Sequence, residues 1–476
     1  MLTGLITQVS SYSPKWRRGL LLALLVGTFG VIFGVAIGLG TQKLAFVFAL
    51  VAISLALRWP VEVALGSVAL ALPFEAMFVA VQNSSGATSL IWFVSAGAAA
   101  LLVARILSGV RQPPPRMAIL WVLMVIWETT TILWAIDGNV ALKRLPMAWS
   151  LLIFYLVATS SRVTRKQLNL VMAFFILGGC AAAAWAGWGY LSGNSWLGGG
   201  RASLIVGDTE MDPNYFAAML LVPFGFALAM LLSARKRLFK ISMAGPVALV
   251  GVSIFLTMSR GAMLALLTML AFYGYRMRVR LRTIAGFALL LAVLAAAAPS
   301  TFWQRLQPEA LRTGAGRTNI WVAGSQIVKH HLLLGVGMAN FPVAYNFYAG
   351  YAPTFEGYSR DSHNTLLKIL SEEGLVGLAL FILALFYQFR GMERARGDSP
   401  TPPILLVCFQ ATLLALLVAG FFIDFLWTKV FWFMLIMCTI ISRVELSTEA
   451  PHSERVVAGR KLSTTDAVLS DAMFTR

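Results

Sequence analysis

The sequence predicts an all-α polytopic membrane protein, and three observations lead to this fold class. Of the 476 residues, 59% are hydrophobic and 12% are charged, and the mean hydropathy is +0.78. Apolar runs of about 15 to 25 residues recur along the chain, and about 20 residues let a helix cross roughly 30 Å of hydrocarbon. Alternating segments of about ten residues, the mark of barrel strands, are absent. We therefore expect a bundle of about 12 to 14 transmembrane helices.

The predicted spans follow the apolar runs from the N-terminus onward. The first run comes after the basic stretch PKWRR and lacks a clear small-residue cleavage site, so we expect a retained helix rather than a signal peptide. Short basic clusters lie between the later runs. The expected spans are roughly residues 19–39, 44–58, 61–80, 89–109, 117–136, 145–160, 167–191, 213–233, 241–258, 261–275, 283–298, 364–389, 403–423 and 426–442.

The formal net charge of +18 comes from these basic clusters, and their placement between apolar runs argues against nucleic-acid binding. With a cytoplasmic N-terminus nearly every cluster falls on the inside, as the positive-inside rule requires, with Lys43, Lys143 and Arg144 as exceptions. We expect an N-terminal transmembrane bundle at 1–298, a large outer loop at 299–363, C-terminal transmembrane helices at 364–442 and a cytoplasmic tail at 443–476.

The outer loop is the one large segment predicted outside the membrane, and long ordered loops usually carry function. It contains GRTNIWVAGSQIVKHHLLLGVGMANF. After Thr318 the apolar residues recur at near-helical spacing, which predicts an amphipathic helix lying on the membrane surface. These residues are Ile320, Trp321, Ile327, Val328, Leu332 and Leu333.

Four polar stretches meet on the outer side in this topology. Arg201 follows three glycines, and Asp212, Pro213 and Asn214 open the span at 213. A capped helix start explains Asp212 and Pro213 but does not explain Arg201. Arg260 interrupts an apolar stretch in TMSRGAM, where the alternative is an arginine that snorkels to the membrane interface.

The third and fourth stretches flank the helix expected in the outer loop. Arg317 lies beside two glycines in GAGRTNIW, which let the backbone approach a ligand closely, and the alternative is a solvated loop arginine. His363 and Asn364 stand where the span at 364 begins, with Asp361 or Ser362 as the expected cap. Backbone N–H groups at a helix N-terminus favour anions, so this position suits a phosphate. The alternative is a polar cap with a bystander histidine.

Together these residues predict a site for a polyanion. Guanidinium groups hold phosphate oxygens and stay charged, and a histidine among arginines has a depressed pKa, which keeps it neutral and able to accept a proton. A lipid-linked diphosphate sugar fits such a site, because stabilised diphosphate is a good leaving group and His363 can take a proton from an attacking hydroxyl.

No metal site or disulfide framework is expected. The three cysteines, Cys180, Cys408 and Cys438, lie in apolar runs far apart in sequence, which is typical of packing residues. His330 and His331 are adjacent on the expected surface helix, and His452 lies in the tail, so no set of metal ligands is assembled.

The ordered series RASLIVGDTEMDPNYFA, TMSRGAML, GRTNIWVAGSQIVKHHLLLGVGMANF and DSHNTLLKILSEEGLVGL resembles the O-antigen ligase and polymerase superfamily of bacterial membrane glycosyltransferases. The resemblance covers roughly residues 200 to 385. It implies a C-type glycosyltransferase-like fold in the bacterial inner membrane, with the large loop and the active site facing the periplasm.

The resemblance also implies an activity and roles for residues. Such enzymes move a glycan en bloc from undecaprenyl diphosphate to an acceptor hydroxyl, with no metal and no cofactor. By motif, Arg201 and Arg317 would bind the diphosphate, Arg260 is a further candidate, and His363 would activate the acceptor. Asn214 and Asn364 are expected to support them.

The acceptor divides this superfamily. We expect a ligase that uses lipid A core, with an O-antigen or exopolysaccharide polymerase that extends a growing glycan as the alternative, and protein O-glycosylation also open. A transporter or flippase would place ionisable residues near the midplane of several spans, whereas the charges here gather on one side. A membrane scaffold with a docking loop gives no reason for arginines and a histidine to gather at span ends.

Overall fold

The computed structural model describes residues 58–75, 90–193, 200–206, 209–279, 300–305, 307, 314–397 and 403–447. The predicted spans 19–39 and 283–298, the span 44–58 apart from its last residue, and the tail after residue 447 lie outside the described residues. The chain divides into two compact units, Met1–Val63 and Ala64–Arg476. The functional site and the helices that hold it belong to the second unit.

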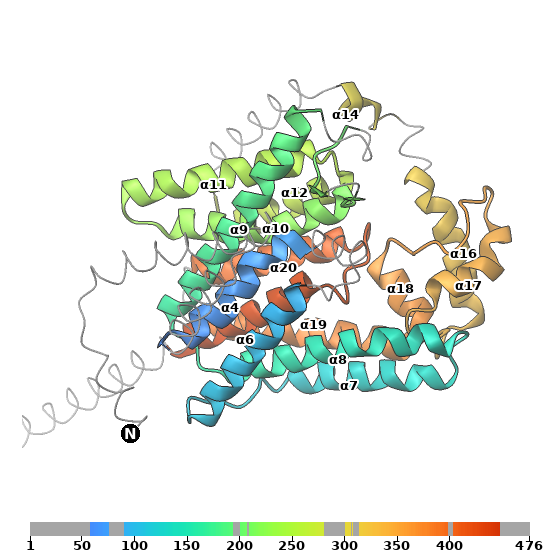
Figure 1. The fold of residues 1–476 in the computed structure, drawn as a ribbon, viewed down its shortest axis with the longest axis horizontal. Helices are drawn as coiled ribbons and strands as arrows, with labels where there is room; N and C mark the ends of the chain where they lie inside the picture. The colour runs from blue at the N-terminus through green and yellow to red at the C-terminus, as the bar shows by residue number, and fades with distance from the viewer. Residues whose placement is uncertain are drawn as a thin grey trace, which may run out of the picture. The chain divides into compact units, whose positions relative to one another are not determined.

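The described residues form an all-α, multi-pass membrane architecture, as the composition predicts (Figure 1). Six of their helices are long and apolar enough to cross a membrane: α8 (Gly138–Ser160), α9 (Arg165–Leu191), α10 (Pro213–Ser233), α11 (Arg237–Leu256), α19 (Gly374–Arg396) and a final helix, Lys429–Ser447. Shorter helices are α4 (Pro60–Ala71) with η2 (Leu72–Phe74), α6 (Leu90–Leu107), α7 (Ala118–Thr130) with η3 (Thr131–Leu133), α12 (Arg260–Arg276) and α20 (Ile404–Ala419).

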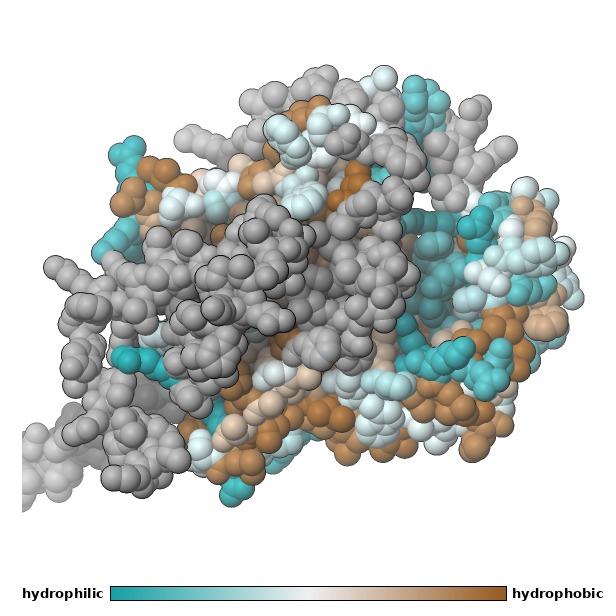
Figure 2. Space-filling view, viewed as in Figure 1, coloured by the Kyte–Doolittle hydropathy of each residue, from teal (hydrophilic) through white to brown (hydrophobic). Residues whose placement is uncertain are grey.

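Helix α10 lies at the centre of the packing, against α9, α11, α12 and α20. Small residues let its neighbours approach closely, as is common between membrane helices. A Cβ atom added at Gly179 of α9 would stand 2.4 Å from the Cβ atom of Pro223. By contrast α7 and α8 keep large apolar side chains such as Ile119, Leu142 and Ile153 exposed, the surface that lipid tails would cover (Figure 2).

The predicted outer loop folds into a small helical layer of its own. It contains α14 (Ser300–Gln304), η4 (Gly314–Gly316), α16 (Arg317–His330), α17 (Phe341–Tyr348) and η5 (Ala349–Tyr351), and α18 (Thr365–Glu372) follows it. Helix α16 confirms the helix predicted after Thr318. Its apolar face, however, is buried in protein against Phe341 and Tyr345 rather than laid on the membrane.

The segment between α16 and α17 attaches this layer to the membrane helices. The Thr131 hydroxyl accepts a hydrogen bond from the Met338 N–H at 2.9 Å, and Asn340 Oδ1 accepts from the Asp137 N–H at 2.7 Å. Gly337 has a φ of +96°, and an added Cβ would lie 2.5 Å from the Cβ of Ala135, so a side chain there would separate the two parts. Figure 1 accordingly shows α16, α17 and α18 at the end of the bundle where α8 begins.

The predicted spans at 145–160 and 364–389 differ from the helices of the structure. Helix α8 begins at Gly138 rather than at 145, because the Asp137 carboxylate caps it and accepts from the N–H groups of Asn139 and Val140. The single span predicted at 364–389 is two helices, α18 and α19, which break at Glu373 and Gly374.

A short antiparallel hairpin of β1 (Ile205–Val206) and β2 (Thr209–Glu210) precedes α10. It follows directly from the segment that carries Arg201 and ends two residues before the cap of α10. The hairpin therefore lies between two elements of the functional site.

Candidate active site

Arg201 is held between the end of α11 and the start of α10. Its backbone neighbour Ala202 donates to the carbonyl of Leu256 at 3.0 Å, and its own Nε donates to the carbonyl of Thr257 at 2.7 Å. A terminal guanidinium nitrogen donates to Asn214 Oδ1 at 2.9 Å. The residue is 8% exposed, so the guanidinium is fixed rather than solvated.

Helix α10 starts as the Asp-Pro pair predicts, and this start positions Asn214. The Asp212 carboxylate accepts from the N–H groups of Asn214 at 2.7 Å and Tyr215 at 3.2 Å, and Pro213 occupies the first helical position. Asn214 thus supports Arg201 through its side-chain oxygen. Asp212 also supplies a negative charge close to the arginines.

Arg260 is the first residue of α12, whose cap is Ser259. One of its terminal guanidinium nitrogens donates to the carbonyl oxygen of Arg305 at 3.1 Å. Arg305 follows α14 and was not predicted from the sequence as a site residue. Its charge interacts with those of Arg260, Arg201 and Arg317, so it adds a fourth guanidinium group to the cluster.

Arg317 begins α16, after Gly316 in the left-handed conformation with φ of +81°. An added Cβ at Gly316 would lie 2.4 Å from a carboxylate oxygen of Glu356. Glu356 in turn accepts from the Asn319 side-chain amide at 2.6 Å. The glycine therefore lets the N-terminus of α16 approach the segment that leads to His363.

His363 lies on the turn before α18 and has a φ of +47°, a conformation that non-glycine residues seldom adopt. The turn is attached to α16, because Trp321 donates its indole N–H to the carbonyl of Ser362 at 3.0 Å. The cap of α18 is Asn364, which accepts from the Leu367 N–H at 3.0 Å, rather than Asp361 or Ser362 as predicted. Asn364 thereby supports the end of the turn that leads into α18.

Burial, together with the charge of Arg317, lowers the pKa of His363 and keeps its imidazole neutral at pH 7. Burial lowers the pKa of His363, and the nearby Arg317 lowers it further, whereas Asp361, Asp212 and Asp424 raise it. The net direction is downward. Burial likewise lowers the pKa of Arg201 to about 10, with a further contribution from Arg305, and this value still leaves the guanidinium charged. The site thus combines charged arginines with an imidazole able to accept a proton.

The structure therefore brings together all four residues predicted to act directly. Arg201, Arg260 and Arg317 all interact electrostatically with Arg305, and the charge of Arg317 acts on His363. In the space-filling view hydrophilic side chains gather beside α16–α18 (Figure 2). Within the described part of the chain no three His, Cys, Asp or Glu residues lie close enough to hold a metal ion.

Sequence reasoning missed Arg305, Lys368 and Asp424. Lys368 binds both Asp361 and Asp424 beside the histidine. A signal for Lys368 exists, because it is a cation that follows two leucines and precedes Ile369 and Leu370, one turn after the Asn364 cap. The signal for Asp424 is an acidic residue in a short turn between two apolar spans.

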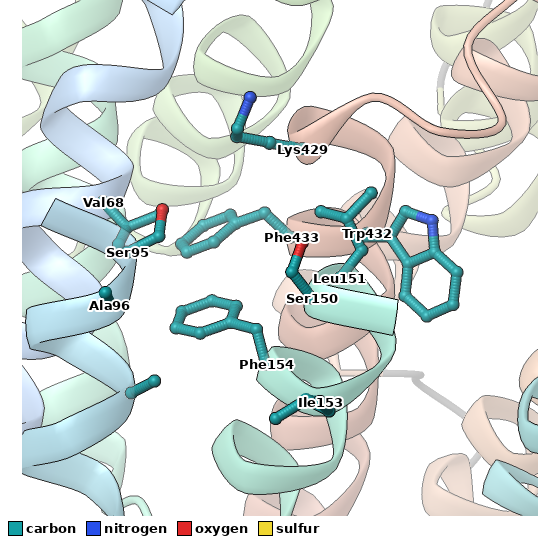
Figure 3. Close-up of a pocket in the computed structure, with 11 residues that line it drawn as sticks. Val68, Ser95, Ala96, Ser150, Leu151, Ile153, Phe154, Lys429, Trp432 and Phe433 are labelled. Atoms are coloured by element: carbon teal, nitrogen blue, oxygen red, sulfur yellow. The ribbon is translucent and has the colours of Figure 1, made fainter. Parts of the chain in front are cut away.

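An apolar cavity of about 220 Å³ lies elsewhere, between α4, α6, α8 and the final helix. Figure 3 shows the rings of Phe154 and Phe433 in it, with Lys429 at one end. Lys429 forms an ion pair with Glu75. The cavity contains none of the arginines or the histidine described above, so it is distinct from the anion site.

The fold and the site define a multi-pass membrane protein that gathers arginines and a neutral histidine at the ends of its helices. Residues 245–382 match the family model described as O-antigen ligase. This segment runs from α11 into α19, and it includes Arg260, Arg317 and His363, whereas Arg201 and Asn214 precede it. No curated protein matches the chain.

The match confirms the resemblance to the O-antigen ligase and polymerase superfamily, whose members are glycosyltransferase-like enzymes. It covers the half of the site formed by α12, α16 and the turn before α18. It does not distinguish a ligase from a polymerase.

Proposed function

We propose that this protein is a glycosyltransferase that moves a glycan en bloc from undecaprenyl diphosphate to an acceptor hydroxyl. The observation that carries the proposal is the convergence of charged arginines on a neutral histidine, His363, within a family match to O-antigen ligase. The first choice of acceptor is lipid A core. The alternative is the end of a growing glycan, which would make the protein a polymerase.

In this proposal the arginines bind the diphosphate of the donor. Asn214 and the carbonyl of Thr257 take two of the N–H bonds of Arg201, and a guanidinium group has five. The remaining donors of Arg201, together with the positive charges of Arg317 and Arg260, suit phosphate oxygens. We propose that this electrostatic stabilisation needs no metal ion.

His363 acts as the base in the proposed reaction. Its neutral imidazole accepts the proton of the acceptor hydroxyl while the oxygen forms a bond to the anomeric carbon of the donor sugar. The bond from that carbon to the diphosphate oxygen breaks, and the diphosphate leaves with the electron pair and with its charge stabilised by the arginines. Atoms and charge balance without any further reactant.

The proposal includes a place in the cell. The protein would lie in the bacterial inner membrane with residues 299–363 as its periplasmic loop, residues 1–298 and 364–442 as its transmembrane parts, and residues 443–476 in the cytoplasm. The site would then meet donor lipid within the outer half of the membrane. Membrane lipid would surround the exposed apolar faces of α7 and α8.

Complementation tests the proposal. Strains that lack either an O-antigen ligase or a polymerase receive the wild type, His363→Ala or, as a matched control, His330→Ala, and glycan banding is compared on a gel. His330 is the last residue of α16, and its exposed ring forms a hydrogen bond with the Gln326 carbonyl and contacts the ring of Tyr348, so it should tolerate replacement. Glycan on lipid A core in the ligase-deficient strain, lost only with His363→Ala, is the expected result.

The other outcomes distinguish among the remaining hypotheses. Long chains restored only in the polymerase-deficient strain would establish the alternative. Restoration by His363→Ala at the level of the wild type would refute the base role. Accumulation of transported lipid in vesicles with His363 replaced would favour a flippase.

A further inference from the structure

Lys368 lies on α18, one turn past the Asn364 cap, and its ammonium group bridges two carboxylates. Its Nζ atom is 3.0 Å from Asp361 Oδ1 and 3.1 Å from Asp361 Oδ2, and 2.7 Å from Asp424 Oδ2. The Lys368 side chain is 14% exposed and that of Asp424 is 8% exposed. The pair of Lys368 with Asp424 is therefore largely shielded from water, whereas the Asp361 side chain is 40% exposed.

This bridge joins the turn that carries His363 to the turn before the final helix. Asp361 stands two residues before the histidine, and its carboxylate also accepts from the Ser362 N–H at 2.8 Å. On the far side the Thr365 hydroxyl donates to the carbonyl of Ile423 at 2.9 Å, and the Tyr215 hydroxyl donates to the carbonyl of Asp424. Lys368 thus connects the histidine turn to the segment that α10 also holds.

The bridge also controls the charge that His363 meets. The charged groups that face the imidazole are Arg317 from α16, Asp361 from its own turn, Asp212 from the α10 cap and Asp424 from the turn before the final helix. Lys368 pairs with two of these three carboxylates. Without its ammonium group these two carboxylates would lose the cation paired with them, and their negative charge would act more strongly on the imidazole.

Stability alone is a weak reason for such a residue. A buried ion pair pays a large desolvation penalty, and well-packed apolar residues often replace one without loss of stability. Apolar side chains in place of Lys368 and both carboxylates would suffice to fill the space. The charge at Lys368 therefore points to a role at the neighbouring histidine.

We propose that Lys368 is a positioning residue for His363: it fixes the turn that presents the imidazole and offsets the carboxylate charge beside it, so that the imidazole stays neutral. This inference rests on the proposed function, in which His363 is the base. Lys368 itself touches neither the donor nor the acceptor in this account.

The test is the dependence of glycan transfer on pH, measured with purified full-length protein in bilayers, with lipid-linked glycan as donor. Lys368→Met should lower the rate about 10- to 100-fold at neutral pH, the range found when outer-shell residues that orient metal-binding histidines are replaced. It should also move the acid limb of the pH–rate profile to higher pH, because Asp361 and Asp424 without the lysine cation favour the protonated imidazole more strongly. Lys368→Arg keeps a cation between the carboxylates and should retain the wild-type limb.

A second variant, Asp361→Asn, should move the acid limb in the opposite direction, and it remains informative if Lys368→Met does not fold. Asp361→Asn removes one of the negative charges that face His363, so the acid limb should move to lower pH. The matched control is Arg276→Met, which breaks the ion pair to Glu393 at 2.7 Å, at the far end of α12 from Arg260. Its acid limb should coincide with that of the wild type.

Two results would overturn the inference. One is a wild-type rate and profile in folded Lys368→Met. The other is a lower rate in Lys368→Met and Asp361→Asn with the acid limb unmoved in both, the behaviour of a purely structural contact. A wild-type protein with no transferase activity would instead refute the proposed function, so the two failures are distinguishable.

Discussion

Replacement of Arg201 by lysine tests the anion site most sharply, because the structure assigns two of its N–H bonds. Nε donates to the Thr257 carbonyl at 2.7 Å and a terminal nitrogen donates to Asn214 at 2.9 Å. Lysine keeps the charge but has one ammonium nitrogen in place of the three nitrogens of the planar guanidinium group. It therefore cannot hold both partners and still face a phosphate. We expect Arg201→Lys to lower kcat/KM by about 10² to 10³, or roughly 3 to 4 kcal/mol of transition-state stabilisation.

The loss of rate expected for Asn214→Ala is the reference against which the loss for Arg201→Lys is compared. It removes one charge-assisted hydrogen bond, which contributes about 1.5 to 3 kcal/mol, and every 1.4 kcal/mol corresponds to about tenfold in rate. The expected loss is therefore at most about 10- to 150-fold. The assay is transfer of a labelled glycan from lipid-linked donor by purified variants in bilayers. A wild-type rate for Arg201→Lys, or a larger loss for Asn214→Ala than for Arg201→Lys, would refute the reasoning.

Three further outcomes follow from the same structure. Because the pKa of His363 lies below its usual range and the neutral form is the base, the rate should stay high at neutral pH and fall as pH drops below about 6.5, and a pH–rate profile that falls already above neutrality would contradict this. Gly337→Val introduces a side chain at φ of +96° against Ala135 and should destabilise the docking of α17 by about 1 to 3 kcal/mol, visible as a lower Tm than that of Gly350→Val, where an added Cβ meets nothing within 4 Å. Transfer should persist in excess EDTA if the arginines alone stabilise the leaving diphosphate, and loss of activity that Mg²⁺ restores would show that a metal takes part.

Local signals in the sequence were sufficient where an element is determined by its own residues. The Asp212–Pro213 pair predicts the start of α10 at the residue where it occurs. The apolar spacing after Thr318 predicts α16 within one residue of its start. The start of α8 was missed because Lys143 and Arg144 lower the local hydropathy, although the cap at Asp137 is a local signal that hydropathy ignores.

Other features depend on partners far away along the chain. The break between α18 and α19 occurs at Gly374, where an added Cβ would lie 2.1 Å from the carbonyl oxygen of Leu333, about forty residues earlier. Lys368 and Asp424 meet only after α18 packs against the turn before the final helix. Helix α16 was predicted to lie on the membrane surface. An amphipathic pattern shows that one face of a helix is covered but does not identify what covers it. In the structure α17 covers that face.

The candidate site was predictable in its residue types but not in its assembly. Arg201 stood out because a capped helix start does not explain it, Arg260 because it interrupts an apolar stretch, and Arg317 because it lies beside glycines. Arg305 escaped because a single arginine in a long loop resembles a solvated one. Its place in the cluster depends on α14 lying beside the start of α12, where Arg260 contacts its carbonyl.

The most direct test of the account is reconstitution of the reaction. Purified protein in bilayers would receive undecaprenyl diphosphate-linked glycan together with lipid A core, and the products would be separated on a gel. The account predicts that the wild type forms glycan-bearing acceptor and free undecaprenyl diphosphate in equal amounts, and that His363→Ala forms neither while it still binds the donor. Equal product formation by His363→Ala, or no transfer by the wild type to lipid A core or to a second glycan, would contradict it.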